Sequence, residues 1–207
     1  MPALPSGLSI EAAIDAELKH NPAVRDGLSA YAGLASGFRL KKDAVALLAG
    51  VLSHAAATYR AAGNRDADLV TFDDGAANFL FDVKQGRTVL CWGVTVSVGA
   101  NTRDDAYHGG FPRAGDGLDK GHAWAHKQGG REGGPNYFRQ ARSLNQGRSR
   151  NGKLWRIIET YLGANAGLPA FVGLRYAAPN KTDQPDEIVY GLITAGQQFR
   201  VVVFPNA

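Results

Sequence analysis

The chain has 207 residues, of which 44% are hydrophobic and 20% are charged, so it is long enough to bury the core of one sizeable domain. Its formal net charge of +4 and its sequence pI of about 9.3 permit a polyanionic partner without requiring one. Its one cysteine, Cys91, excludes an intrachain disulfide and a zinc site built from several cysteines. The apolar neighbours of Cys91 predict a buried position on a strand.

No apolar run approaches the ~20 residues that a membrane-spanning helix needs, so we expect no membrane span. The first residues lack a basic start followed by an apolar stretch, and we therefore expect no Sec-type signal peptide. The protein is expected to act in the cytoplasm, to be carried into a target cell by a specialised secretion system, or to be cut from a longer polypeptide.

The N-terminal part is predicted to be helical. Apolar residues at helical spacing follow Ser9, a residue type that favours the N-cap position. A stronger pattern of the same spacing ends at Gly63, a natural stop. We expect residues 1–65 to form a helical N-terminal segment and residues 66–207 to form a second domain. The segment either packs on that domain or serves as an adaptor for delivery or for a partner.

Strand patterns come next in the chain. Segments 69–72 and 79–83 flank an Asp-Asp-Gly turn signal. In residues 88–98 the large side chains recur at every second position, from Leu90 to Val98, which places them on one face of a strand. Together these segments predict an antiparallel meander.

Residues 100–150 are rich in Gly, Arg, Asp and Asn and show little apolar periodicity. A stretch of this length without regular structure is usually functional or disordered, and its spaced histidine and asparagine residues favour function. Positive charges concentrate after residue 130, where a run of basic residues stands against one acid, Glu132. The basic residues are Arg131, Arg139, Arg142, Arg148, Arg150, Lys153 and Arg156. They form either a surface for a polyanion or a solvated basic face.

The last part of the chain returns to regular patterns. An amphipathic helix is predicted from Asn151, as its cap, to Gly163, as its stop. Three strands, over residues 171–176, 188–194 and 199–204, close the chain.

The chemistry of the central stretch starts from His122. An imidazole has an ordinary pKa of ~6.5, so the neutral ring can take a proton from water near neutral pH. Gly121 lacks a side chain, which would let a substrate backbone approach. Asp119 either accepts a hydrogen bond from one ring nitrogen or is a turn residue. The alternative is that His122 is a loop histidine without a role.

Asn145 offers a neutral oxygen to a hard cation that keeps several of its waters, unless it only caps a helix or forms a turn. Asn136 is better suited to bracing the loop through backbone groups than to ligating a metal. Glu159 lies fourteen residues after Asn145 and would share its face on an unbroken helix, although Gly147 and Gly152 argue against one. Glu159 either orients a metal-bound water or is a surface acid.

These residues form a pattern that resembles the DNA/RNA non-specific endonuclease family, whose members are ββα-metal (His-Me finger) nucleases. The family pattern has an Asp-Arg-Gly-His step, a Gly-Gly pair, an Asn with a nearby Gln, an Asn in a Leu-Asn-x-Gly context, and a Trp followed by a Glu. The matching residues are, in order, Asp119-Lys120-Gly121-His122, Gly129-Gly130, Asn136 with Gln140, Leu144-Asn145-Gln146-Gly147, and Trp155 with Glu159. Segments 188–190 and 204–206 are similar to the closing strands of such domains, whereas the resemblance does not reach residues 1–65.

The resemblance implies an α+β fold with a ββα-metal nuclease core. Such a core has a central antiparallel sheet, a long catalytic loop and a helix, here preceded by the helical N-terminal segment. The resemblance further implies that His122 is the general base, that Asn145 binds the metal and that Glu159 is the acidic helper. Asp119 and Asn136 would support them.

The resemblance also assigns the substrate contacts. Lys120 stands where the family has an arginine, which keeps the positive charge but removes the bidentate fork. The family's phosphate-binding arginine lies upstream; Arg103 and Arg113 both fit, and Arg113 is favoured because it is nearer. His126 either contacts phosphate or has a structural role. Three further arginines would steer the nucleic-acid backbone: Arg139, Arg142 and Arg148.

The implied reaction is hydrolysis of phosphodiester bonds in DNA, with RNA as a second candidate, aided by Mg²⁺, Mn²⁺ or another divalent cation. No base-reading motif is evident, so little sequence preference is expected. Nucleases of this type resemble bacterial toxin effectors, and a toxin would require an immunity protein. Two alternatives stay open: a catalytically silent nucleic-acid-binding module, and an interaction protein in which the N-terminal helices matter most.

Overall fold

A seven-stranded antiparallel sheet forms the centre of the protein. The computed structural model describes residue 4 and residues 7–35, 42–98 and 117–207. The strand order is β1-β9-β8-β7-β4-β3-β2. These strands are β1 (Arg25–Asp26), β2 (Leu69–Asp74), β3 (Ala77–Asp82), β4 (Arg87–Val94), β7 (Pro169–Arg175), β8 (Glu187–Ile193) and β9 (Phe199–Pro205). Strands β5 (Leu118–His122) and β6 (Tyr137–Ala141) form a separate two-stranded sheet. The mixture of helices and antiparallel strands confirms the predicted α+β class.

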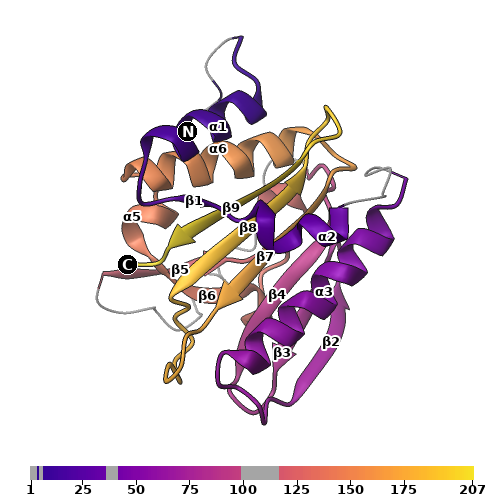
Figure 1. Ribbon diagram of the computed structural model, residues 1–207, viewed down its shortest axis with the longest axis vertical. Coiled ribbons are helices and arrows are strands. Elements are labelled where there is room, and N and C mark those ends of the chain that lie inside the picture. Colours follow the sequence, from indigo (N-terminus) through magenta and orange to yellow (C-terminus); the bar gives the residue numbers. More distant parts are fainter. Residues whose placement is uncertain (1–3, 5–6, 36–41, 99–116) are drawn as a thin grey trace.

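Helices cover both faces of the large sheet (Figure 1). The two long ones are α3 (Ala44–Ala61), which packs on β4 and β7, and α6 (Arg150–Ala164). Two neighbouring residues of β8 show that helices α3 and α6 lie on opposite faces of the sheet. Val189 faces a pocket beside α3, whereas the ring of Tyr190 packs against Trp155 of α6 with a centroid distance of 4.9 Å. Successive side chains of a strand point to opposite faces, so the sheet lies between two helical layers.

The N-terminal segment is helical, as predicted, and it also extends the sheet. Its helices are α1 (Ile10–His20), the 3-10 helix η1 (Leu28–Tyr31), α2 (Ala32–Ala35) and α3. The Ser9 side chain accepts a hydrogen bond from the Ala12 amide at 3.1 Å, which confirms the predicted N-cap. Helix α3 ends at Ala61, and Gly63 follows with a φ of +95°, a backbone conformation that favours glycine.

Both β1 and α1 contact parts of the chain that are distant in sequence. In β1, Arg25 lies opposite Val203 of β9. Beside the sheet, α1 packs on α6, where Nε of Arg150 donates to Oε2 of Glu17 at 2.7 Å. Side chains from the N-terminal helices and from the later strands belong to one continuous hydrophobic core.

Strands β2, β3 and β4 form the predicted antiparallel meander. Cys91 in β4 is fully buried, as expected. The predicted strand over residues 88–98 is too long, however. It ends at Val94, because the next two amides leave the ladder: those of Thr95 and Val96 donate to the carbonyls of Leu168 and Gln128. Val96 is therefore 44% exposed and is not part of the strand face.

The prediction of little regular structure in residues 100–150 is wrong for residues 117–150. They contain the β5–β6 hairpin, the 3-10 helices η2 (His126–Gln128) and η3 (Gly134–Asn136), and the short helix α5 (Arg142–Asn145). The strands were missed because β5 has a Leu-Asp-Lys-Gly-His sequence without apolar alternation. Residues 100–116, with Arg103 and Arg113, lie outside the described residues.

The ends of α6 differ from the prediction. Its cap is Ser149, whose hydroxyl accepts from the Gly152 amide at 3.0 Å, whereas the predicted cap, Asn151, bonds to α1 through Asn21. Gly163 lies inside the helix and does not end it. A Cβ atom on Gly163 would come within 2.8 Å of the Cβ of Lys127, so this glycine allows η2 to approach the helix. Within the described residues, no helix combines the length and apolar character needed to cross a membrane.

Candidate active site

The first cluster of predicted site residues is built around Asp119. Its Oδ1 accepts from Nε of Arg142 at 3.0 Å, and its Oδ2 accepts from the side-chain amides of Asn145 at 3.1 Å and Gln146 at 2.7 Å. Burial opposes ionisation of Asp119, but the hydrogen bonds from these three residues outweigh it and lower the pKa of the carboxyl below its ordinary value of 3.8. Asp119 therefore fixes α5 against β5 as a carboxylate.

Asn145, at the C-terminal end of α5, is oriented by this carboxylate. Its Nδ2 atom donates to Asp119, and this hydrogen bond establishes which end of the side-chain amide is the nitrogen and which is the oxygen. Within the described part of the chain, its Oδ1 accepts no hydrogen bond. The atom of Asn145 that can ligate a hard cation is thus the one left available. Glycine at position 147, with a φ of +68°, ends the turn after α5.

A second cluster surrounds His122, at the end of β5. Its Nε2 lies 3.0 Å from Oε2 of Glu132, and the hydroxyl of Tyr137 donates to the same carboxylate oxygen. His122 and Tyr137 are register partners in the hairpin, and their rings meet edge to face with centroids 5.0 Å apart. The His122 and Glu132 side chains are 12% and 7% exposed. Glu132 lies in the loop between the two strands and had no predicted role.

The interpretation of Asp119 is wrong in both of its forms. Asp119 does not bond to the imidazole, because Glu132 takes that place, and it is a strand residue rather than a turn residue. Close packing is sufficient to require glycine at position 121. A Cβ atom on Gly121 would lie 2.4 Å from Oε1 of the buried Gln140 side chain, on the partner strand.

Asn136 braces the loop between the two strands of the hairpin. Its Oδ1 accepts from the Trp124 amide at 2.7 Å, and its Nδ2 donates to the carbonyls of Trp124 at 2.9 Å and Arg131 at 2.8 Å. All three bonds go to backbone groups, and Asn136 is buried. This arrangement holds the ends of the segment that carries Glu132.

Glu159 lies on α6, separated from Asn145 by the end of α5, so the two are not on one unbroken helix. Burial raises the pKa of Glu159 above its ordinary value of 4.5, against the opposing charges of Arg156 and His122. Nη1 of Arg156 donates to Oε2 of Glu159 at 2.7 Å. The charge of His122 acts on Glu159 across the gap between β5 and α6, and the burial of Glu159 excludes the surface-acid interpretation.

The predicted substrate-binding residues divide into two groups. Arg142 and Arg148 line a hollow of about 480 Å³ beside α5, and Arg148 is exposed and forms no ion pair within residues 117–207 or the other described parts. Lys120 and Arg139 face each other in the hairpin register. The ammonium of Lys120 lies 5.8 Å from the centre of the Tyr137 ring, and Arg139 is 3.7 Å from Asp183. His126 lies half-buried in η2.

The structure thus brings the predicted residues together in two hydrogen-bonded clusters. Among residues 117–207, no hydrogen bond or ion pair joins the Asp119 cluster to the His122 cluster. The described residues also contain no group of three His, Cys, Asp or Glu side chains that could hold a metal ion. A cation here would depend on a neutral oxygen, on water and on the substrate.

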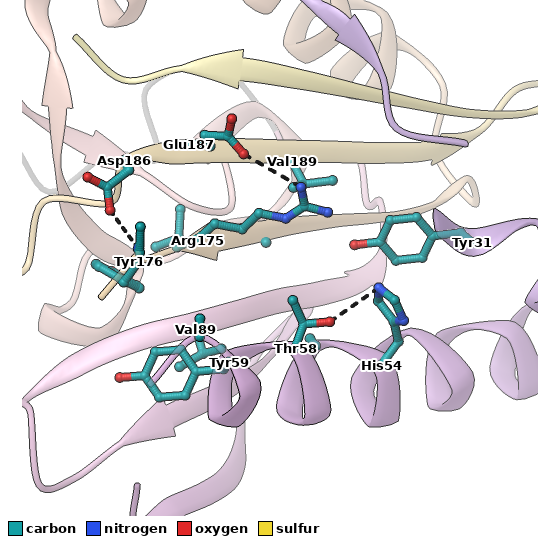
Figure 2. A pocket seen from close by; sticks show the side chains of 15 residues that line it. Tyr31, His54, Thr58, Tyr59, Val89, Arg175, Tyr176, Asp186, Glu187 and Val189 are labelled. Atoms are coloured by element: carbon teal, nitrogen blue, oxygen red, sulfur yellow. Dashed lines mark hydrogen bonds and ion pairs between the residues drawn. The ribbon is translucent and has the colours of Figure 1, made fainter. Parts of the chain in front are cut away.

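A separate pocket of about 380 Å³ lies between α3 and strands β7 and β8 (Figure 2). Its polar side chains bind one another: Arg175 pairs with Glu187 at 3.6 Å, and Thr58 lies 3.4 Å from a ring nitrogen of His54. Burial, together with the charge of Arg175, lowers the pKa of His54. The pocket contains none of the predicted site residues, and the pairing of its polar groups makes it a poorer candidate for a reaction centre.

No protein-family model matches the chain, and no curated protein matches it. Among solved structures, it is similar to a structure of the Sda1 nuclease with a bound zinc ion, at 13% sequence identity and a TM-score of 0.46. That similarity covers 63% of this chain and 74% of the other.

Proposed function

We propose that the chain is a divalent-metal-dependent endonuclease that hydrolyses phosphodiester bonds, with a ββα-metal core. The observation that carries the proposal is the hydrogen bond from the Asn145 amide nitrogen to Asp119, which leaves the amide oxygen of Asn145 available. The order of elements also supports it, because strands β5 and β6 are followed directly by α5 and α6. In this β5–β6–α5–α6 unit, the residues that would act on the substrate are His122, at the end of β5, and Asn145, at the end of α5.

The donor set fits a hard cation such as Mg²⁺ or Mn²⁺. Asn145 would hold it through Oδ1, and phosphate oxygens and water would complete the coordination. When bound, such an ion neutralises charge on the phosphate and stabilises the leaving oxygen. Glu159 is buried on α6, where Arg156 donates to its carboxylate, and we assign to it the orientation of water.

His122 is assigned as the general base. It takes a proton from a water molecule whose oxygen attacks phosphorus, and the bond from phosphorus to the leaving sugar oxygen breaks on the opposite side. The leaving oxygen then takes up a proton from solvent.

Nucleic acid is the substrate that the surface supports best. Arg142 and Arg148 line one hollow beside the Asp119 cluster, where exposed guanidinium groups can bind successive phosphates. Lys120 would add a phosphate contact from β5, and Arg113 remains the proposed upstream phosphate ligand. These contacts involve the sugar-phosphate backbone, so we expect DNA, and RNA as a second substrate, to be cut with little sequence preference.

The biological setting is proposed with the activity. A small basic nuclease suits the role of an antibacterial toxin effector delivered into a target cell, with an immunity protein that covers the site. Expression in a bacterial cytosol would then arrest growth and degrade chromosomal DNA, and the His122→Ala variant would abolish both effects.

Plasmid nicking in the presence of Mg²⁺ tests the proposal. His122→Ala should lower the rate by about 10²- to 10⁴-fold, the usual contribution of a general base. Asn145→Ala should raise the Mg²⁺ concentration needed for half-maximal activity. His20→Ala, at the exposed end of α1, is the matched control and should cut at the unmodified rate.

Other outcomes separate the alternatives. Salt-sensitive binding of DNA without cleavage under any divalent ion would identify a silent binding module. Absence of DNA binding would favour an interaction protein. Cleavage by His122→Ala at the unmodified rate would remove the general-base assignment.

A further inference from the structure

The pocket between α3 and strands β7 and β8 is separate from the proposed nuclease site (Figure 2). It lies on the α3 face of the sheet, whereas α6, which carries Glu159, packs on the opposite face. Its volume of about 380 Å³ is within the ~300–1,000 Å³ that small-molecule sites occupy in proteins. A ligand in this pocket would therefore contact residues that have no part in the proposed cleavage of nucleic acid.

A missing side chain in the middle of β7 opens the floor of this pocket. Phe171, Gly173 and Arg175 alternate along one face of the strand. A Cβ atom on Gly173 would make only ordinary contacts, the nearest at 3.6 Å from the Cβ atom of Val189, so a side chain added there would enter the pocket. The pocket is therefore suited to a ligand whose body is largely apolar. The apolar side chains that line it are Ala55, Ala62, Val89, Leu174, Ala177 and Val189.

The guanidinium group of Arg175 offers hydrogen-bond donors to the pocket. The Arg175 side chain is 28% exposed, and Oε2 of its ion-pair partner Glu187 lies 3.6 Å from Nη1, which is longer than a hydrogen bond. The other oxygen of Glu187, Oε1, is bound by Arg25. One carboxylate thus serves two guanidinium groups and neutralises the charge of Arg175 only in part.

Tyr31 adds a second donor beside this guanidinium. Burial raises the pKa of the Tyr31 hydroxyl, while the charge of Arg175 and a hydrogen bond from its guanidinium oppose that shift. A guanidinium can only donate, so the Tyr31 oxygen accepts and its proton can be donated to a ligand. The Tyr31 ring packs against His54 and Phe171, with centroid distances of 4.7 Å and 5.2 Å, and Figure 2 shows its hydroxyl directed toward Arg175.

Two further polar residues leave this end of the pocket suited to an anion. Burial and the charge of Arg175 lower the pKa of His54, so its ring is largely neutral near pH 7. Asp186 lies at the opposite end in Figure 2, and its carboxylate accepts from the backbone amide of Ala177 at 2.7 Å. A negative group is therefore stabilised best between Arg175 and Tyr31.

We propose that this pocket binds a small organic acid with an apolar body, whose carboxylate is held by Arg175 and Tyr31 and whose body lies over Gly173. A carboxylate matches the fork of the guanidinium, and the phenolic hydroxyl supplies a further donor. The body displaces water from the apolar side chains of the pocket. This binding function is additional to the proposed nuclease activity and does not depend on it.

The probes are 2-naphthoate and octanoate, each compared with its neutral amide. Backbone amide chemical shifts of the full-length protein, titrated near pH 7, should give at least one of the acids a Kd of about 0.1–1 mM, which is usual for ligands of this size. The shifts should concentrate in α3, β7 and β8. The amide keeps the same apolar body without the charge, and should bind about 10-fold or more weakly than its acid.

Three variants test the residues that would hold the carboxylate. Arg175→Met keeps an apolar stem but removes the charge, and should weaken binding of the acid about 10- to 100-fold while changing that of the amide less than about twofold. Tyr31→Phe keeps the ring contacts and should weaken binding of the acid about 3- to 10-fold. Arg60→Met removes the same charge from an exposed position on α3 outside the pocket, and should bind the acid like the unmodified protein.

Two variants that fill the space test the location. Gly173→Leu, or Ala55→Leu on α3 if the first variant does not fold, should abolish binding of both the acid and the amide. Ala57→Leu places the same side chain on the exposed side of α3 and should leave binding unchanged. The dispersion of the amide spectrum shows that each variant is folded.

Three results would overturn the proposal. The first is the absence of shifts with either acid at a concentration tenfold above the expected Kd. The second is an amide that binds as tightly as its acid, which would remove the role of Arg175. The third is binding of the acid to a folded variant in which the pocket is filled, which would place the ligand elsewhere on the protein.

Discussion

At the scale of single residues, the Asp119 carboxylate determines how Asn145 is presented. Three side chains donate to its two oxygens, and two of them come from α5. The lowered pKa of Asp119 means that these hydrogen bonds stabilise the folded protein. A folded-state pKa below the unfolded value gives a stabilisation that is present above pH 3.8 and is lost as the pH falls through the folded value.

Asp119→Asn should therefore destabilise the protein by about 1–3 kcal/mol at neutral pH, because an amide cannot accept from three donors. The difference in unfolding free energy between the two proteins should shrink below pH 3.8. Urea unfolding at a series of pH values measures it. Asp68→Asn removes the same charge from an exposed position and should change little. A pH-independent difference would contradict the linkage.

The residue scale also shows what the sequence could predict. Residue types at functional spacing led to Asp119, Asn136, Asn145 and Glu159, all of which lie in or beside the two clusters. Glu132 could not be found this way. Its role depends on a loop that folds back on β5, and in the sequence it is only one acid in a basic stretch. A glycine such as Gly121 is also difficult to interpret from the sequence, because glycine can be required either by close packing or by the approach of a substrate.

At the scale of elements, Asn206 joins the β5–β6 hairpin to the large sheet. It follows β9 and is buried; its Oδ1 accepts from the Ala141 amide at 2.8 Å. Its Nδ2 donates to the carbonyls of Arg139 at 2.9 Å and Pro185 at 2.8 Å. One side chain thus satisfies backbone groups of β6 and of the loop before β8.

Asn206→Ala should cost about 2 kcal/mol or more of stability, because it leaves these buried backbone groups without partners. Hydrogen exchange should accelerate most in β6, and the proposed nuclease activity should decline as the hairpin loosens. Asn78→Ala removes a single hydrogen bond of 3.4 Å and serves as the control. Equal exchange in β6 of the two variants would argue against this role of Asn206.

Elements with strong periodicity could be predicted from the sequence, whereas those held by long-range contacts could not. Helices α1 and α3 and strands β7, β8 and β9 have clear apolar patterns and lie close to their predicted ranges. The β5–β6 hairpin has no clear apolar pattern, because its strands are short and β5 consists largely of polar and glycine residues. Strand β1 is two residues long and exists only through its pairing with β9.

At the scale of the whole molecule, the N-terminal helices are built into both helical layers. Helix α3 covers one face of the sheet, and α1 packs on α6, which carries Glu159. The sequence predicted helices here but could not predict where they dock, since docking depends on pairs such as Glu17 with Arg150, 133 positions apart. We therefore expect substitutions in the N-terminal segment to affect the candidate site as well.

The pairing of β1 with β9 has a consequence for solubility. Strand β9 contains the run Val201-Val202-Val203-Phe204, and its outer edge is covered by β1 and by the amide of Gly27, which donates to the Val201 carbonyl at 2.9 Å. A Cβ atom on Gly27 would come within 2.8 Å of the Val201 side chain. Gly27→Ala should lift this cover and promote self-association, visible by light scattering, whereas Gly33→Ala, which meets open space, should stay monodisperse. The two-residue strand β1 would then protect the valine-rich edge of β9 from pairing with further copies of the chain.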